Sequence, residues 1–211
     1  MKKVLVFDFD GTLVDSRLDL LNTVNQMRKY YGLAPLPLEQ VLSYVGDGVK
    51  MLRARSLSDS KVDPETAMEV MQQAYRANLN LASTLYPGVY KTIRDLQQNG
   101  WKIALFSNKE QDFCKSALYE FGIGTCFDVI LGRTDDFPLK PDPEGLLFIQ
   151  ELLGIEDVAG SWMIGDSAQD ILAGRAAGMK TCFCNFGFGD RKGEEPTAYI
   201  DKFEDLKQIL A

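Results

Sequence analysis

An apolar segment that ends in two acids opens the sequence and limits the folds open to it. Residues Val4 to Phe7 are aliphatic or aromatic, and Asp-Phe-Asp-Gly-Thr follows at residues 8–12. Such a run predicts a buried strand, and side chains two positions apart on a strand lie on the same side. The carboxylates of Asp8 and Asp10 would repel each other unless one is protonated or a cation lies between them. A hard divalent cation with oxygen ligands relieves the repulsion, so the segment predicts a metal site at the end of a strand. The alternative, a strand that runs into an acidic turn, explains Gly11 but not the two acids.

The length and composition fit a globular protein that buries a core. The chain has 211 residues, of which 45% are hydrophobic, enough for one large domain or one domain with a smaller insert. Its formal net charge is −7 and it has no run of Lys or Arg, which argues against a nucleic-acid partner. No apolar run approaches the roughly 20 residues of a membrane span, and too few apolar residues precede Asp8 for a signal peptide. We therefore expect no membrane partner.

The reactive residue types are restricted as well. The sequence contains no histidine, which excludes histidine triads, histidine general bases and histidine metal ligands. The cysteines, Cys114, Cys126, Cys182 and Cys184, form no C-x-x-C motif, and we expect them to be reduced in a cytoplasmic protein, with Cys114 and Cys126 in the core. The chemistry must then rely on carboxylates, hydroxyl groups, lysine and a metal ion.

The sequence pattern changes near residue 85. Residues 15–84 show helical patterns only, and after them apolar strands alternate with helices. The later strands are expected at 102–108, 128–132, 162–166, 181–186 and 199–200. The helices are expected at about 15–31, 38–44, 49–57, 63–81, 89–98, 110–121, 141–153, 170–177 and 203–210. Alternating strands and helices are typical of α/β proteins with a parallel sheet. We predict a Rossmann-like core of residues 1–14 and 85–211, into which residues 15–84 are inserted as a small α-helical cap domain.

Polar residues follow the apolar strands at their carboxyl ends. Asp8 and Asp10 follow the first strand, Ser107 and Asn108 end the second, and Asp166 ends a later one. Ligands of open parallel sheets bind at these ends. We therefore expect the side chains to meet in one site, with the helical insert as a lid.

Four short motifs occur in a fixed order along the chain. They are Asp8-x-Asp10-Gly11-Thr12, Ser107-Asn108, Lys140-Pro141-Asp142-Pro143 and Gly165-Asp166-Ser167-x-x-Asp170. Together they span the chain and resemble the haloacid dehalogenase superfamily of hydrolases. The helical insert resembles the branch with a small helical cap. Further segments are similar to those of phosphoglycolate phosphatases, among them Leu13-Val14-Asp15-Ser16, Tyr44-Val45-Gly46-x-Gly48 and Leu85-Tyr86-Pro87-Gly88-Val89. Ser107 stands where that group usually has Thr, and Glu110 where it often has Pro, which leaves the substrate open.

The motif residues indicate a division of chemical work. The Asp8 carboxylate is suited to attack phosphorus and form an aspartyl-phosphate. Asp10 is close enough to protonate the leaving oxygen and later to deprotonate water. Asp8, Asp10 and Asp166 can supply a Mg²⁺ site, and the resemblance implies that Asp10 binds through its backbone carbonyl. By the same resemblance, Asp170 lies just outside the metal ligands or serves as an additional one.

Phosphate binding is expected from hydrogen-bond donors and a cation around the acids. Ser107, Asn108 and the backbone of Gly11 and Thr12 can donate to phosphate oxygens, and Lys140 can pair with both the phosphate and the nucleophile. Taken singly, Lys140 would be a solvated loop residue, and Ser107 and Asn108 would be a helix cap. The ordered set of four motifs favours a site.

Other charged residues are expected to have structural roles. Asp47 lies between two glycines, as is typical of a turn residue, and Lys109, Arg17 and Lys50 are expected to be surface charges. Lys50 follows that turn and could reach a substrate carboxylate, a role that we do not favour.

The sequence as a whole predicts a Mg²⁺-dependent phosphatase of a small phosphate monoester, with 2-phosphoglycolate as the best candidate. The expected partner is that small phosphorylated substrate, and the expected state is a monomer or homodimer. Alternatives within the fold are a phosphomutase, a pyrophosphatase and a dehalogenase, of which the last needs no metal and leaves the acids unexplained. A further alternative is a non-catalytic phosphate-binding protein, which a missing catalytic carboxylate would favour; none is missing.

Overall fold

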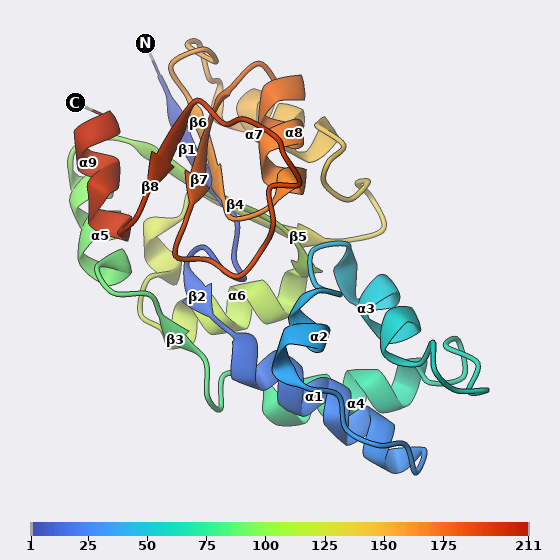
Figure 1. Cartoon of the computed structure of the whole chain (residues 1–211). Helices are drawn as coiled ribbons and strands as arrows, with labels where there is room; N and C mark the ends of the chain where they lie inside the picture. The colour runs from blue at the N-terminus through green and yellow to red at the C-terminus, as the bar shows by residue number, and fades with distance from the viewer. Residues whose placement is uncertain (1, 211) are drawn as a thin grey trace. The chain divides into compact units, whose positions relative to one another are not determined.

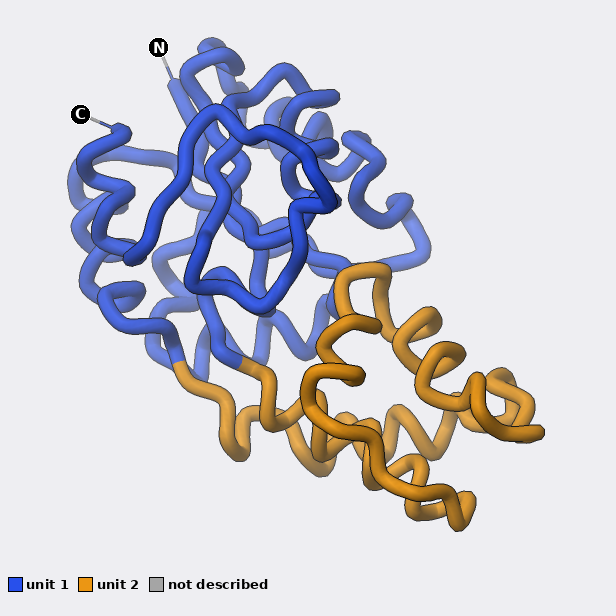
Figure 2. Tube along the Cα trace, in the orientation of Figure 1, with its two compact units in different colours: residues 1–15, 85–211 blue, residues 16–84 orange. Residues whose placement is uncertain are grey.

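The computed structural model describes residues 2–210 and divides into two compact units (Figure 2). Unit 1 consists of Met1–Asp15 and Leu85–Ala211, and unit 2 consists of Ser16–Thr84. Unit 2 is therefore a single insertion into the sequence of unit 1. Two short strands, β2 (Val14–Asp15) and β3 (Thr84–Leu85), pair with each other.

Within residues 2–210, unit 1 is built on one six-stranded sheet with the strand order β5-β4-β1-β6-β7-β8 (Figure 1). Every neighbouring pair in this sheet is parallel. The strands are β1 (Val4–Phe7), β4 (Lys102–Glu110), β5 (Val129–Arg133), β6 (Trp162–Gly165), β7 (Lys180–Cys184) and β8 (Ala198–Ile200). The prediction of an α/β fold with a parallel, Rossmann-like sheet is confirmed.

Strand β1 lies inside the sheet, at the point where the strand order reverses. Val6 pairs with Ala104 of β4 on one side and with Met163 of β6 on the other. The chain adds β4 and β5 on one side of β1 and then returns to add β6, β7 and β8 on the other. Parallel sheets bind ligands at such a point, beyond the carboxyl ends of the strands. In unit 1 that place lies just after Phe7 and Gly165.

Helices cover both faces of this sheet, because its strands are apolar on both sides. The helices of unit 1 are α5 (Val89–Gln98), α6 (Gln111–Glu120), α7 (Glu144–Leu153), α8 (Ala168–Ala176) and α9 (Leu206–Ile209), with 3-10 turns at Gly124–Cys126 and Phe203–Asp205. Leu5 and Phe7 pack in one core cluster with residues of α5, α6 and α9, whereas Val4 and Val6 pack in a second cluster with residues of α7 and α8. This alternation follows from the two-residue period of a strand, and apolar runs are typical of sheets buried on both faces.

Unit 2 is formed by helices, of which α1 and α4 pack against each other (Figure 1). The helices are α1 (Arg17–Tyr30), α2 (Leu38–Leu42), α3 (Gly48–Ser56) and α4 (Met68–Asn78). With 14 residues, α1 is the longest helix within residues 2–210, and no helix in that range could cross a bilayer.

The last helix of unit 2 begins later than the sequence predicts. Asp63 and Pro64 favour a helix start near residue 63, whereas α4 begins at Met68. The N–H groups of Thr66 and Met68 bond to carbonyl groups three residues back, as in a 3-10 turn. The Asp63 carboxylate also accepts the Glu65 N–H at 3.0 Å, a local bond that competes with the helical pattern.

A buried arginine ties three segments of unit 2 together. The Arg28 side chain on α1 is 2% exposed. Its Nε donates to the Ala34 carbonyl at 2.6 Å, and its Nη1 donates to the Ser56 carbonyl at 2.5 Å. Nη1 and Nη2 also donate to the two carboxylate oxygens of Asp59, each at 2.8 Å. The guanidinium group therefore satisfies backbone acceptors that would otherwise lie in a dry interior.

Candidate active site

Three neighbouring strands of unit 1 end in polar residues at one edge of the sheet. Asp8 follows β1, and its N–H donates to the Ile164 carbonyl of β6 at 2.9 Å. Asp166 directly follows β6, and residues 107–109 lie in the last part of β4. Because β1 pairs with both β4 and β6, these side chains are brought to the same edge.

An irregularity in β4 removes its polar residues from the regular ladder. Phe106 pairs with Leu131 and Glu110 pairs with Arg133, so four steps along β4 match two steps along β5. The extra residues form a bulge, which interrupts the usual alternation of side chains and is often found next to active sites. Residues 107–109 lie inside this bulge.

Three buried carboxylates form a cluster beyond β1 and β6. Oxygen atoms of Asp8, Asp166 and Asp170 lie within 4.8 Å of one another. Lys140 reaches this cluster from the loop before α7, with its Nζ 2.8 Å from Asp8 Oδ1 and 2.6 Å from Asp170 Oδ1. The Lys140 side chain is 2% exposed, so the charges interact with little screening by water.

The electrostatics of the acid cluster reflect an excess of negative charge. Burial raises the pKa of Asp166 well above its usual value, and the carboxylates of Asp170 and Asp8 raise it further, although two backbone N–H groups lower it. Burial also raises the pKa of Asp170, and the charge of Lys140 only partly opposes this. For Lys140, burial favours a lower pKa, but the charges of Asp170 and Asp8 outweigh it and raise the pKa above its usual value. One lysine does not balance three acids, so a bound cation would stabilise the cluster.

Backbone N–H groups of the loop between β7 and β8 hold the side chain of Asp166. Asp166 Oδ2 accepts the N–H of Phe188 at 3.0 Å and that of Gly189 at 2.7 Å. A Cβ atom at Gly187 or at Gly11 would collide with the Asp166 carboxyl group, and Gly11 has a φ of +79°. The sequence, in which residues 185–189 follow the phosphoglycolate phosphatase pattern only loosely, did not predict a role for this loop, although two glycines after a strand at the ligand-binding edge were a usable signal.

Asp170 is oriented by the helix that it caps. Its Oδ2 accepts the Ser167 hydroxyl at 2.6 Å and the Ser167 N–H at 3.0 Å, in a capping box at the start of α8. Its other oxygen faces Lys140. A Cβ at Gly165 would collide with Asp170, so the close approach of this acid to the end of β6 requires glycine there.

Asn108 holds the backbone of Lys140. The Lys140 N–H donates to Asn108 Oδ1 at 2.8 Å, and Asn108 Nδ2 donates to the Lys140 carbonyl at 3.0 Å. The Lys140 Nζ also lies 5.6 Å from the centroid of the Phe106 ring. The Asn108 amide therefore joins β4 to the lysine loop, and its donation to phosphate stays a prediction.

The second acid of the opening motif pairs with a different lysine. Lys109 Nζ lies 3.0 Å and 3.1 Å from the two carboxylate oxygens of Asp10. The Lys109 side chain is 6% exposed and that of Asp10 is 14% exposed. The expectation that Lys109 is a surface charge is therefore wrong. Its position directly after Ser107 and Asn108, at the ligand-binding end of a strand, was the signal that could have placed it.

The turn after Asp10 uses its own N–H groups. Gly11 N–H donates to the Val14 carbonyl at 2.9 Å, and Thr12 N–H donates to the Phe9 carbonyl at 3.4 Å. In the structure both N–H groups stabilise the turn, and their donation to phosphate stays a prediction. The Thr12 hydroxyl is buried and has no hydrogen-bond partner among the residues that the structure describes.

The remaining residues singled out in the sequence have structural or surface positions. Lys50 is 71% exposed, as predicted. The Asp47 carboxylate accepts a bond from Arg55 Nη2 at 2.6 Å, which ties the turn before α3 to that helix. Cys114 and Cys126 are buried, which confirms their predicted place in the core.

The donor set of the acid cluster suits a hard divalent cation. Such ions bind carboxylate oxygens, and Mg²⁺ in particular combines a few carboxylates with water and phosphate oxygens. The side chain that joins Asp8 and Asp166 in the cluster is Asp170, whereas the Asp10 side chain lies against Lys109. The pKa values of the buried Asp166 and Asp170 are raised, and a bound cation would relieve the repulsion among the three carboxylates of the cluster.

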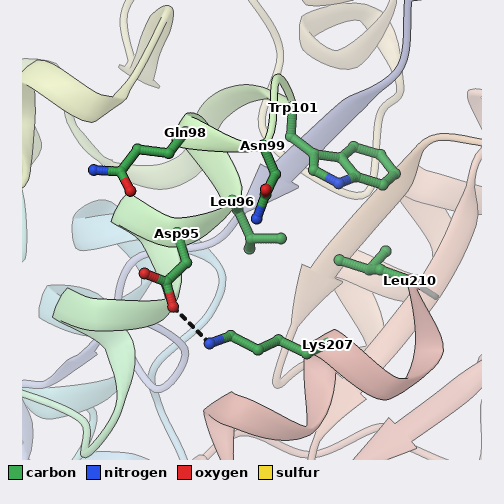
Figure 3. Close-up of a pocket in the computed structure, with 7 residues that line it drawn as sticks. All are labelled: Asp95, Leu96, Gln98, Asn99, Trp101, Lys207 and Leu210. Carbon is green, nitrogen blue, oxygen red and sulfur yellow. Dashed lines mark hydrogen bonds and ion pairs between the residues drawn. The ribbon is translucent and has the colours of Figure 1, made fainter.

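A pocket elsewhere in unit 1 has a different character (Figure 3). It is lined by Asp95, Leu96, Gln98, Asn99, Trp101, Lys207 and Leu210. Asp95 and Lys207 form an ion pair of 2.7 Å across it. Trp101 directly precedes β4, so the pocket lies toward the amino ends of the strands, opposite the acid cluster. We therefore place the candidate active site at Asp8.

Comparisons with known proteins identify the family of the chain. Residues 5–184 match the family model described as haloacid dehalogenase-like hydrolase. The chain is 38% identical to a phosphoglycolate phosphatase of Psychrobacter arcticus, over 99% of this chain and 96% of that protein. It is 34% identical to phosphoglycolate phosphatase 1 of Pseudomonas aeruginosa, over 98% of this chain and 79% of that protein.

Solved structures give the same assignment. The fold is similar to a crystal structure described as a predicted phosphoglycolate phosphatase from Haemophilus somnus 129PT, with a TM-score of 0.92 and 26% identity. That match covers 100% of this chain and 98% of the other. The resemblance predicted from the four motifs is confirmed, and the chain belongs to the haloacid dehalogenase-like hydrolases as an enzyme of the phosphatase type.

Proposed function

We propose that the protein is a Mg²⁺-dependent phosphatase that hydrolyses a small phosphate monoester through an aspartyl-phosphate on Asp8. The observation that carries this proposal is the position of Lys140, whose Nζ bridges Asp8 and Asp170 within the acid cluster at the end of β1. A nucleophilic carboxylate beside a fixed cation, with two further acids to hold a metal, is the arrangement that phosphoryl transfer requires.

The metal is proposed to bind the side chains of Asp8, Asp166 and Asp170, together with the backbone carbonyl of Asp10 that the family resemblance implies. When bound, the ion would neutralise negative charge on the transferring phosphoryl group. The hydrogen bonds from the β7–β8 loop to Asp166, and from Ser167 to Asp170, fix the orientation of two of these carboxylates. Such outer contacts are a usual feature of metal sites.

Asp8 performs the covalent step in this proposal. One carboxylate oxygen attacks phosphorus, an Asp8–phosphorus bond forms, and the bond from phosphorus to the leaving oxygen breaks. Lys140 holds Asp8 in position and, with the Ser107 hydroxyl, stabilises charge on the phosphate oxygens. Ser107 is buried, so a bond from its hydroxyl would form with little competition from water.

Asp10 moves the proton in each half-reaction. Its carboxyl group donates a proton to the leaving oxygen in the first half. In the second half it accepts a proton from the water that attacks phosphorus, and the Asp8 carboxylate is released with inorganic phosphate. No histidine is present in the sequence to take this role.

The proposed substrate is 2-phosphoglycolate, because the relatives that match nearly the whole chain are named phosphoglycolate phosphatases. We also propose that unit 2 serves as the helical cap of this family, as the position of the insert suggests.

Phosphate release from a panel of substrates tests the proposal. Purified protein with Mg²⁺ is assayed on 2-phosphoglycolate, sugar phosphates, nucleotides and pyrophosphate, and kcat/KM should be highest for 2-phosphoglycolate. Activity on pyrophosphate alone would show that the substrate is a phosphoanhydride and not a phosphate monoester. Absence of turnover on every compound would overturn the phosphatase and favour a phosphate-binding role.

A further inference from the structure

We infer that Lys109 is a positioning residue for the reaction, which holds the Asp10 carboxylate in place for both proton transfers. This inference rests on the proposed function, in which Asp10 is the acid and base. It adds a residue that is neither a metal ligand nor a phosphate ligand in that proposal.

The contact between the two side chains is close and largely shielded. Lys109 Nζ lies 3.0 Å from Asp10 Oδ1 and 3.1 Å from Asp10 Oδ2. An ammonium group near both oxygens fixes the rotation of the carboxylate as well as its position. Exposed ion pairs are mobile and contribute little to stability. Here, however, the Lys109 side chain is only 6% exposed and that of Asp10 only 14%.

Several contacts of neighbouring residues hold Lys109 in place. The residue lies in the β4 bulge, where its N–H donates to Ser107 Oγ at 3.4 Å and its carbonyl accepts from Cys114 Sγ at 3.7 Å. Its Nζ lies 5.1 Å from the centroid of the Phe9 ring, the residue between the two acids of the motif. The lysine is therefore held from β4 and reaches across Phe9 to Asp10.

Stability alone gives a weak reason for such a pair. Burying a lysine and a carboxylate costs desolvation of both, and replacing buried ion pairs with apolar side chains is often neutral or stabilising. The neighbouring lysine in the same region, Lys140, already pairs with Asp8 and Asp170. A separate lysine for Asp10 lets the proton-transfer carboxylate be oriented independently of the nucleophile.

The two half-reactions depend differently on this orientation. An alkyl phosphate needs a proton on its leaving oxygen, so both halves require a well-placed Asp10. An aryl phosphate such as p-nitrophenyl phosphate has a good leaving group and needs little help in the first half. In the second half, water attacks the aspartyl-phosphate and gives a proton to Asp10, so this half still requires Asp10 as the base.

The experiment compares Lys109→Met with the wild type and with Lys109→Arg. On 2-phosphoglycolate, or the best alkyl phosphate of the panel, kcat should fall about 10- to 100-fold in Lys109→Met, with KM changed much less. On p-nitrophenyl phosphate, rapid mixing should give a burst with a nearly wild-type rate constant followed by a slowed steady state. Lys109→Arg, which keeps a cation, should restore part of kcat. Lys115→Met, at an exposed lysine of α6, is the control and should behave as the wild type.

The outcomes separate this inference from the proposed function. Equal losses in the burst and the steady state would indicate general disorder of the site and overturn the positioning role. Wild-type kinetics in Lys109→Met would overturn it as well. If the wild type itself turns over neither substrate with Mg²⁺, the proposed function fails, and this inference falls with it.

Discussion

Each unit of the molecule buries a cationic side chain, and the partners of the two cations differ. Lys140 in unit 1 and Arg28 in unit 2 are both 2% exposed. Arg28 donates to two backbone carbonyl groups and to Asp59, whose side chain is 57% exposed. The Lys140 Nζ instead faces Asp8 and Asp170, in a cluster with more acids than cations.

The difference distinguishes a cation with a structural role, Arg28, from one in a candidate catalytic site, Lys140. Arg28 satisfies acceptors that already exist in the folded backbone, so its contacts are complete in the protein alone. Lys140 leaves a surplus of buried negative charge around it, which a metal ion and a phosphate would complete. Strongly perturbed buried carboxylates are common at functional sites, and the raised pKa values of Asp166 and Asp170 fit that pattern.

The largest expected effect is the loss of the nucleophile that Lys140 faces. Asp8→Asn should lower kcat by about 10⁴-fold or more, because no covalent intermediate can form. Its fold should be retained, since one of three repelling charges is removed. Phosphate release and thermal unfolding measure both effects. The matched control is Asp59→Asn, at the carboxylate partner of Arg28, which should keep wild-type turnover. Equal turnover in the two variants would end the distinction between the two buried cations.

Removal of the metal is the next largest effect. EDTA should lower activity by about 10³-fold, because a bound metal contributes several kcal/mol to charge stabilisation in such reactions. Adding Mg²⁺ back should restore the activity of the EDTA-treated wild-type enzyme. The Asp166→Asn variant should need a far higher Mg²⁺ concentration to regain its own activity. Titration of activity against free Mg²⁺ measures this. Full activity in EDTA would point to metal-independent chemistry of the dehalogenase type.

Much of unit 1 could be predicted because its signals are local. The apolar run at Val4 to Phe7, and the alternation of strands and helices after residue 85, determine a parallel sheet. The acids of the site follow their strands directly, so the topology alone brings Asp8 and Asp166 to one edge. The family motifs added Lys140, which no periodicity would place.

What could not be predicted depends on irregular backbone. Lys109 lies in the β4 bulge, and bulges have no reliable sequence signature. The loop donors of Phe188 and Gly189 act through backbone N–H groups, which are the same in every residue type except proline. Likewise Arg28 has no motif around it, since its partners are carbonyl groups brought near by the packing of unit 2.

Substitution of Lys140, the lysine in the acid cluster, should have the third-largest effect on activity. Lys140→Met should lower kcat about 10²- to 10³-fold at saturating Mg²⁺, because a fixed charge beside the reacting oxygens is lost. The control is Lys180→Met, at an exposed lysine outside the acid cluster. Lys180 Nζ lies 5.3 Å from the centroid of the Trp162 ring, a contact similar to that between Lys140 and the Phe106 ring. The control variant should turn over as the wild type does, which separates the charge at the site from the ring contact. A Lys140→Met enzyme within tenfold of the wild type would show that the cluster does not need its lysine.

Substitution of the buried arginine should have the smallest effect on turnover. Arg28→Met should lower the free energy of unfolding by about 1–3 kcal/mol, because two backbone carbonyl groups lose their donors while Asp59 can be hydrated. At a temperature where unit 2 stays folded, kcat should remain close to that of the wild type. Chemical denaturation and steady-state kinetics on the same preparation measure both quantities. Arg76→Met, at an exposed arginine of α4, is the control and should change stability by no more than about 0.5 kcal/mol. A large fall in kcat without a loss of stability would assign Arg28 to the chemistry, and burial beside backbone carbonyls would no longer mark a structural cation.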